Sequence, residues 1–542
     1  MSNNPTTTSR QPLPSLTGKA TGRRAPLGNE GWGWVFFFFL LAWLWASWWM
    51  GDVMRIAYER SFFAADATLM RWLWQKSFGW LWVIGRALLT LYRWPVVGGL
   101  FVAILLTGGS WIIGYCLHLP RRWRWTQYLP AFAWMMWTAY VGLNLYYYRE
   151  PGRILAIPFL VVVVFGIWAG LSPLRSGHLT RHKSEHLQKT KVITPSLIGR
   201  AGSGALLLII FFAIPSFYLT LRHPYLRPLT KMQVQLMHND YEGMSKTAHE
   251  HADMGNRQMA GYYAIALART GHLADQLFDI KLDFDTVRAL GYNDKPNLCL
   301  NYHIIDCDYH AGLYRAARHY AVEDLTMDGP SLYIMKMLVK ISLLEGDWRL
   351  ARKYLHVIGK APFEGEFIHQ YEPMVGHPDL VTADPELGAV LHCAPPNHTF
   401  EQMAEKPAFI GYYALLKQFK DTEAATWSAV ACLYAKRMED FLKRCGKFMD
   451  TTPPRSIIEG LVLETPKYPD IQDAFPQVEL GFDRFELFLQ EAQPYMEDRA
   501  LGSEVLFDKY KGYYPYYYFF GNLKATRKPG DDEQGHNRAG VN

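Results

Sequence analysis

Long apolar stretches alternate with short polar segments over the first 222 residues of the chain. A membrane-spanning helix needs about 20 apolar residues, because the hydrocarbon core is about 30 Å thick and each helical residue rises about 1.5 Å. Backbone groups in lipid must bond within their own segment, so such stretches are expected to be helical. The stretches of this length are Gly31–Gly51, Trp94–Pro120, Trp125–Tyr148, Ile154–Leu174 and Ala201–Leu221. The pattern therefore predicts a polytopic transmembrane helix bundle over residues 31–222.

A further apolar segment, Ser77–Tyr92, is shorter and carries Arg86 in its middle. It is consistent with a short span whose arginine faces other helices, or with a helix lying in the membrane interface among several tryptophans. We expect six spans if it crosses the membrane, and five as the alternative.

Basic residues near the helix ends predict the orientation. The loop 175–200 holds six Lys and Arg against one acid, Glu185, and the linker 121–124 contains three arginines. Both should be cytoplasmic, which places residue 223 onward in the periplasm of a bacterial inner-membrane protein. Six spans would put the N-terminus outside, in conflict with its basic residues Lys19, Arg23 and Arg24, whereas five spans would put it inside.

Residues 223–520 show helical periodicity and an internal repeat of 34 residues. The residues that define it pair as Gly312 with Gly346, Tyr314 with Trp348, and Ala317 with Ala351. This period and these residue types resemble the tetratricopeptide repeat, in which glycine relaxes the turn between paired helices and alanine lets them approach closely. A weaker copy, Ala264–Ala274, contains Gly271. The repeat predicts a C-terminal α-solenoid of helix pairs, and hence an all-α protein.

The chain as a whole resembles uncharacterised multi-pass bacterial membrane proteins that carry a C-terminal tetratricopeptide-like helical domain. Within that domain, residues 364–400 are rich in proline and histidine, and an irregular insertion is expected there. The polar tails 1–30 and 521–542 are expected to be disordered.

Charge divides the chain at the same place as hydropathy. Residues 1–222 hold 22 Lys and Arg against 6 Asp and Glu, a net +16, whereas the remaining residues hold 34 against 44, a net −10. Because the basic excess belongs to the apolar half, the net charge of +6 does not indicate nucleic-acid binding. The expected partners are the lipid bilayer and a protein.

Candidate chemistry is sparse. Three acids follow the first span, Asp52, Glu59 and Asp66, and they are the catalytic candidates if the protein is a membrane transferase acting on a lipid-linked glycan or envelope polymer. Cys299, His303, Cys307 and His310 share one helical face, but they extend over about 16 Å, too far for one metal ion. No nucleotide, cofactor or metal motif is present, so we expect no cofactor and no metal site.

One stripe of the helix 332–344 is a candidate binding surface, formed by Tyr333, Met337, Ile341 and Leu344. The same stripe is also consistent with core packing. The leading hypothesis is a scaffold or assembly protein of the cell envelope, whose repeat domain binds a protein or peptide. The alternatives are the transferase and, less well supported, a transporter component.

Overall fold

The computed structural model describes residues 29–117, 121–141, 152–175, 195–282, 300–327, 329–394 and 421–521. The expected tails 1–30 and 521–542 fall almost entirely outside these ranges. The described residues form helices and no strand, so the all-α prediction is confirmed. Below, the N-terminal half denotes residues 29–222 and the C-terminal half residues 223–521.

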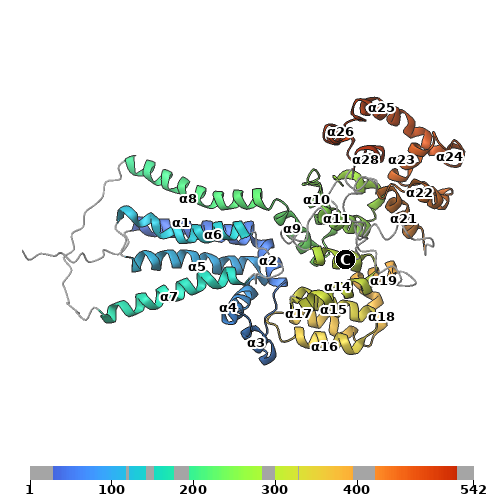
Figure 1. The fold of residues 1–542 in the computed structure, drawn as a ribbon. Coiled ribbons are helices and arrows are strands. Elements are labelled where there is room, and N and C mark those ends of the chain that lie inside the picture. The colour runs from blue at the N-terminus through green and yellow to red at the C-terminus, as the bar shows by residue number, and fades with distance from the viewer. Residues whose placement is uncertain are drawn as a thin grey trace, which may run out of the picture.

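Long helices of the N-terminal half run side by side, and the C-terminal half lies at one end of this bundle (Figure 1). The bundle helices are α1 (Asn29–Leu44), α5 (Pro95–Cys116), α6 (Leu129–Val141), α7 (Arg153–Arg175) and α8 (Pro195–Arg222). Shorter elements lie at the end near the C-terminal half: the π-helical turn η1 (Trp45–Trp49), α2 (Gly51–Glu59), α3 (Ala67–Trp74), α4 (Gly79–Leu89) and the 3₁₀ turn η2 (Thr90–Arg93). A 3₁₀ segment, η3 (Arg121–Tyr128), precedes α6.

The predicted count of six spans is wrong for the described residues. Two helical segments there are long and apolar enough to cross a membrane, Pro95–Cys116 and Ile154–Leu171. The count rises to four if two bent pairs each make one span: Gly33–Trp49 with Gly51–Glu59, bent by 59°, and Leu206–Arg222 with Leu226–Met237, bent by 83°.

The short apolar segment Ser77–Tyr92, which was either a sixth span or an interfacial helix, does not form a long helix. Its helix α4 has 11 residues and therefore rises only about 16 Å, half of the hydrocarbon thickness. The side chain of Arg86 is buried, and its Nη1 donates a hydrogen bond to the carbonyl oxygen of Phe62 at 3.0 Å. The arginine thus faces protein, as one of the two sequence interpretations required, but its helix is too short to span.

The C-terminal half is a series of short helices. The first group is α9 (Leu226–Met237), α10 (Tyr241–His249), α11 (Arg257–Thr270), α12 (Leu273–Gln276), α13 (Leu300–His310), α14 (Tyr314–Met327), α15 (Leu332–Leu344) and α16 (Trp348–Ile358). The second group is α17 (Gly365–Tyr371), α18 (Pro378–Ala383), α19 (Pro385–Cys393), α21 (Thr422–Tyr434), α22 (Met438–Cys445), α23 (Arg455–Glu464), α24 (Asp470–Ala474), α25 (Phe482–Ala492), α26 (Arg499–Val505), α27 (Phe507–Tyr510) and α28 (Tyr514–Phe520).

Five helix pairs close with the same turn. In each, one residue has a left-handed backbone, and the next N–H bonds to the carbonyl five residues earlier at 2.8–2.9 Å, which is the hydrogen-bond pattern of a Schellman cap. The left-handed residues are Asn239, Gly271, Gly312, Gly346 and Lys436. The sequence repeat found the three glycines, but it missed Asn239 and Lys436, which adopt positive φ without being glycine.

The other repeat residues lie where the pattern requires. Ala317 and Ala351 are fully buried, and each belongs to the second helix of a pair, α14 or α16. Tyr314 is buried and Trp348 half-buried at the starts of these helices. The close helix contact that the alanines permit is therefore present in both pairs, α13 with α14 and α15 with α16.

The irregular insertion expected at 364–400 is instead helical through residue 393. Pro378 and Pro385 each occupy the first position of a helix, where the missing N–H is not needed and the fixed φ suits the helix. These two prolines therefore begin helices within a segment whose proline content had suggested irregular structure. Residues 395–400 lie outside the described part of the chain.

We predict unequal costs for two equivalent glycines. A Cβ at Gly346 would meet no atom closer than 3.8 Å, so Gly346→Ala should cost only the left-handed strain, about 1–2 kcal/mol. A Cβ at Gly312 would come within 2.5 Å of the backbone of Cys393 and Ala394, so Gly312→Ala should cost clearly more. Denaturant unfolding of the purified protein in detergent measures both, and equal costs would contradict the close packing of α19 on this turn.

Candidate functional site

The three acids proposed as catalytic do not converge. Asp66 caps the N-terminus of α3, accepting from the backbone N–H of Thr68 and Leu69, and pairs with Lys360 at 2.8 Å. Asp52 belongs to α2, where its charged neighbours are Lys231 and Arg227. Only Glu59 enters a buried site, so the arrangement lends no support to a three-carboxylate active site.

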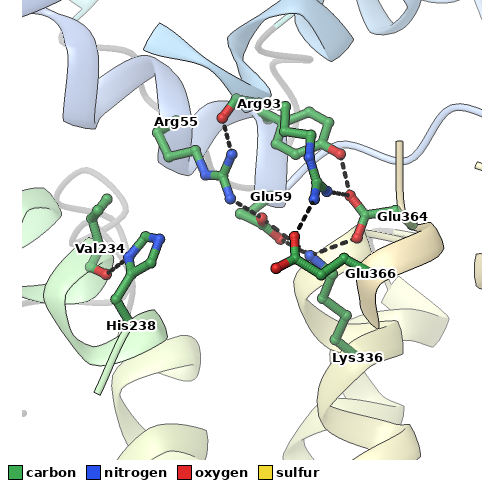
Figure 2. A network of polar contacts seen from close by, with 9 residues as sticks. Arg55, Glu59, Arg93, Val234, His238, Lys336, Glu364 and Glu366 are labelled. Atoms are coloured by element: carbon green, nitrogen blue, oxygen red, sulfur yellow. Dashed lines mark hydrogen bonds and ion pairs between the residues drawn. The ribbon is translucent and has the colours of Figure 1, made fainter. Parts of the chain in front are cut away.

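Glu59 belongs to a buried ion-pair network between the two halves (Figure 2). The ammonium of Lys336 on α15 lies 3.1 Å from a Glu59 carboxylate oxygen and 3.0 Å from one of Glu364. Arg55, one turn before Glu59 on α2, approaches it at 3.4 Å, and Arg93 of η2 approaches Glu364 at 2.8 Å. Both carboxylates are about 1–3% exposed, so this network joins α2 and η2 to α15 and the start of α17.

Hydrogen bonds from the N-terminal half complete the network. The hydroxyl of Tyr58 donates to Glu364, and the guanidinium of Arg55 donates to the carbonyl of Arg93. Arg93 also reaches Glu366 at 3.1 Å, but that carboxylate is exposed to solvent (Figure 2). Breaking a buried pair by removing one partner costs about 3–5 kcal/mol, so these contacts hold the halves in one relative position.

Next to this network the helices leave a small cavity that is partly open to solvent. Residues of both halves line it, from α2, α9, α13, α15 and α19 and the residue after α2. The lining residues are Ile56, Glu59, Arg60, Gln233, Leu236, Met237, Tyr302, Asp306, His310, Tyr333, Met337, Lys340 and Glu386.

One polar wall of the cavity is the pair of Lys340 and Glu386. The ammonium lies 2.7 and 2.8 Å from the two carboxylate oxygens, and Tyr309 donates to the same carboxylate at 2.9 Å. Burial opposes both charges, but each partner outweighs it: the pKa of Lys340 is raised and the pKa of Glu386 is lowered. Both groups therefore stay charged at neutral pH.

A hydrogen-bonded chain crosses from the N-terminal half to Asp306 on α13. Arg60 donates to Gln233 at 3.1 Å, Gln233 donates to the hydroxyl of Tyr262 at 2.9 Å, and that hydroxyl donates to Asp306 Oδ2 at 2.8 Å. Burial raises the pKa of Asp306 to about 7, against the opposing effect of the Tyr262 hydrogen bond. Burial and the charge of Arg269 lower the pKa of His310 to about 3, so this imidazole is neutral.

The predicted binding stripe divides between cavity and core. Tyr333 and Met337 line the cavity, and Met337 is also buried in the hydrophobic core together with Ile341 and Leu344. None of the four therefore belongs to an open groove, and core packing accounts for Met337, Ile341 and Leu344.

The cysteines and histidines that share one helical face in the sequence do not form a single site in the structure. Cys307 lies 3.6 Å from a ring nitrogen of His303, both buried in the core, and His310 lines the cavity. Cys299 lies outside the described residues. Among those that are described, no group of three or more His, Cys, Asp and Glu side chains is arranged to hold a metal ion.

Three charged residues of the cavity, Asp306, Lys340 and Glu386, were not found from the sequence. Each of these residues lies among apolar residues on a helix face that is otherwise buried. A charged residue in such a position is the local signal that could have indicated a buried polar site. The partners of each ion pair are far apart in the sequence, by 46 residues for Lys340 and Glu386 and by 277 residues for Lys336 and Glu59. The sequence therefore does not show which acid pairs with which base.

We predict that Lys336→Met destabilises the protein by about 3 kcal/mol, because two buried carboxylates lose the ammonium that they share. Adding Glu59→Gln should recover part of this loss, since it removes one of the uncompensated charges. Denaturant unfolding in detergent is the measurement, and Lys353→Met on the exposed face of α16 is the control, with an expected cost below about 0.5 kcal/mol. A similar cost for the two single variants would mean that the network does not stabilise the fold.

The comparisons with known proteins give a family but no activity. No curated protein and no solved structure matches the chain. A family model described as "Family of unknown function (DUF6057)" matches residues 146–521. This range includes the bundle helices α7 and α8 and all the described helices of the C-terminal half. Because this match covers more than half of the chain, the protein belongs to the DUF6057 family.

Proposed function

We propose that this protein is a membrane scaffold of the bacterial cell envelope, whose C-terminal half binds a protein partner and holds it at a fixed position beside the bilayer. The observation that carries this proposal is the buried junction of Lys336, Glu59 and Glu364. A domain that only had to stay near the membrane would need no more than a tether. Burying several charges to fix its orientation is useful where the orientation itself matters.

The hydrophobic packing supports the same interpretation. One continuous core cluster includes residues of α1, α2 and α5 and extends into α13, α15 and α19. A second cluster joins α9–α12 to α21–α28. Because the first cluster crosses from one half to the other, the two halves move together at the junction.

The C-terminal half has features of a binding solenoid. Five helix pairs share one turn geometry, and two successive pairs keep the 34-residue period of tetratricopeptide repeats. Such arrays present extended surfaces to proteins or peptides. Exposed large apolar side chains gather between residues 480 and 505, in the part farthest along the chain: Leu480, Leu487, Leu501 and Val505. We assign the partner surface to this region.

A five-span arrangement accounts for the bundle. Helix α1 runs toward the C-terminal half, and α5, α6, α7 and α8 follow with alternating direction, so that α8 leads directly into α9 (Figure 1). This count requires α6 to span together with neighbouring residues. It puts the N-terminus on the same side as the basic segments 121–124 and 175–200, which removes the conflict that six spans create. The N-terminus is then cytoplasmic and the C-terminal half periplasmic.

We expect reporter fusions to follow this orientation. Alkaline phosphatase folds only after export, so a fusion after Arg227 should be active, whereas fusions within 180–190 and after Arg24 should be inactive. A green fluorescent protein fused at the same positions should give the opposite pattern, as the control for expression. An active fusion after Arg24 would contradict five spans, and an inactive one after Arg227 would contradict the periplasmic location.

Site-specific photocross-linking in living cells tests the scaffold function. A photoreactive amino acid at Leu480, Leu487 or Leu501 should give one discrete adduct with the same partner protein, identified by mass spectrometry. The matched controls are Glu323 and Lys353, which are exposed but polar positions on α14 and α16.

The scaffold proposal fails if the leucine positions give no adduct, or if the control positions give the same one. It also requires an intact junction: in the Lys336→Met variant, at equal abundance, the adduct should decrease because the partner is no longer held in one position.

A further inference from the structure

A short helical hairpin, formed by α3 and α4, lies beside the end of the bundle nearest to the C-terminal half (Figure 1). Its contacts with two candidate spans fix its depth. Gly85 of α4 packs on Gly152, the residue before α7, and a Cβ at either position would come within 2.5 Å of the other residue's backbone. The turn η2 then leads from α4 directly into Pro95, where the other span begins. The hairpin therefore lies at the level where both spans begin.

The hairpin exposes large aromatic side chains. Trp74, Phe78 and Trp80 are 61%, 69% and 40% exposed, and Trp94, the N-cap of α5, is 47% exposed. The half-buried residues of α4 are all apolar or aromatic. An apolar surface of this kind is rarely left in water, and tryptophan is enriched where a bilayer meets water. The composition and the depth of the hairpin thus both indicate the membrane interface.

Exposed apolar side chains also lie on the spans next to the hairpin. The first turns of α5 expose Val96, Val97 and Leu100, and α7 exposes Ile157 and Val161. The α4 helix contacts α7, and η2 contacts α5. Because α4 rises only about 16 Å, it fits along the interface and not across the bilayer. The lipid that surrounds the spans is therefore the nearest apolar medium for the exposed face of the hairpin.

The tip of the hairpin carries Phe78 in a left-handed backbone conformation, with φ 58° and ψ 39°. Bulky side chains are rare in this conformation, which glycine adopts without strain. The next residue, Gly79, completes a tight turn, since a Cβ there would come within 2.2 Å of the carbonyl oxygen of Leu73. The Phe78 ring is mostly exposed, so packing within the protein does not offset this strain. A surface that covers the ring from outside accounts for both features.

The hairpin is also basic. Residues 67–94 contain four Lys and Arg and no Asp or Glu. Arg86 and Arg93 bond to groups within the protein. Arg71 is exposed on α3, and the ammonium of Lys76 lies within 4.4 Å of the centres of two tryptophan rings. Basic residues beside interfacial tryptophans favour headgroups of negative charge, so charge complementarity favours anionic lipid.

We propose that the α3–α4 hairpin lies in the bilayer interface on the side of the C-terminal half and binds anionic phospholipid there. Trp74, Phe78 and Trp80 insert between the headgroups, and Arg71 and Lys76 approach the phosphate groups. The ion pair between the N-cap of α3 and the residues after α16 connects this anchor to the repeat helices. This lipid-binding surface goes beyond the scaffold role and requires no protein partner.

Lipid photocross-linking of the full chain tests the proposal. The protein is reconstituted in nanodiscs that contain equal amounts of phosphatidylcholine and phosphatidylglycerol. Benzoylphenylalanine replaces Phe78 or Trp80, so that the new side chain is also aromatic, and mass spectrometry identifies the lipid in each adduct. Val164, 59% exposed on α7, is the positive control. Leu480, 89% exposed beside α25 and far from the bundle, is the negative control (Figure 1).

We expect phospholipid adducts at Phe78, Trp80 and Val164, and none at Leu480. At Phe78, phosphatidylglycerol should exceed phosphatidylcholine by about fivefold, which is the effect of one basic residue near an anionic surface. At Val164 the two lipids should appear in equal amounts. Adding Arg71→Gln should lower the ratio at Phe78 toward one. Lys443→Gln, on the exposed face of α22, removes a cation far from the bundle and should leave the ratio unchanged.

The absence of lipid adducts at both Phe78 and Trp80, under conditions that label Val164, would overturn the interfacial position. A discrete protein adduct at these positions in living cells would assign the surface to a protein partner. A lipid ratio near one at Phe78, or a ratio that Arg71→Gln leaves unchanged, would overturn the selection of anionic lipid. These results are independent of the scaffold proposal, which is tested by protein adducts at the opposite end of the C-terminal half.

Discussion

The ammonium of Lys336 between the carboxylates of Glu59 and Glu364 is the contact on which the arrangement of the two halves depends. Each of these groups is costly to bury alone, and they are tolerable together only at one geometry. Apolar surfaces pack in many relative positions at similar cost, whereas a shared ammonium fixes one. The network therefore supplies orientation more than it supplies stability.

Two bends of the chain bring this network about. Helix α2 turns by 59° from the preceding span, and α9 turns by 83° from α8, so that both leave the direction of the bundle and pack against each other beneath the C-terminal half. Glu59 on α2 then faces Lys336 of α15, and Gln233 on α9 faces Tyr262 of α11. Because of these bends, α2 and α9 form the surface against which helices such as α11 and α15 pack.

The cavity is a consequence of the same junction. Helices of both halves meet there, and side chains of α2, α9, α13, α15 and α19 line the space between them. Charged side chains line it, among them Lys340 and Glu386, and Glu59 belongs both to the cavity wall and to the ion-pair network.

The sequence by itself determined the local structure of this protein. Runs of apolar residues specified the bundle helices, and a 34-residue spacing of glycine, aromatic residue and alanine specified the paired helices, because these signals act over one or two turns. It also placed Gly312 and Gly346 in the turns between paired helices, where the structure gives both a left-handed backbone. It overcounted the spans, because the length of α4 and the bends after α1 and α8 depend on what packs against them. It also predicted an irregular insertion where Pro378 and Pro385 begin helices, since a proline ends one helix or begins another according to its neighbours.

Only the tertiary structure determined which residues come together in the site. Glu59 was grouped in the sequence with Asp52 and Asp66 as an acid after the first span, yet it is buried because α15 brings Lys336 to it from 277 residues away. Asp306, Lys340 and Glu386 carried no recognisable motif, since ion pairing requires proximity in space and has no characteristic spacing in sequence. Local periodicity encodes which residues form helices, but the pairing of buried charges is encoded only by how those helices pack.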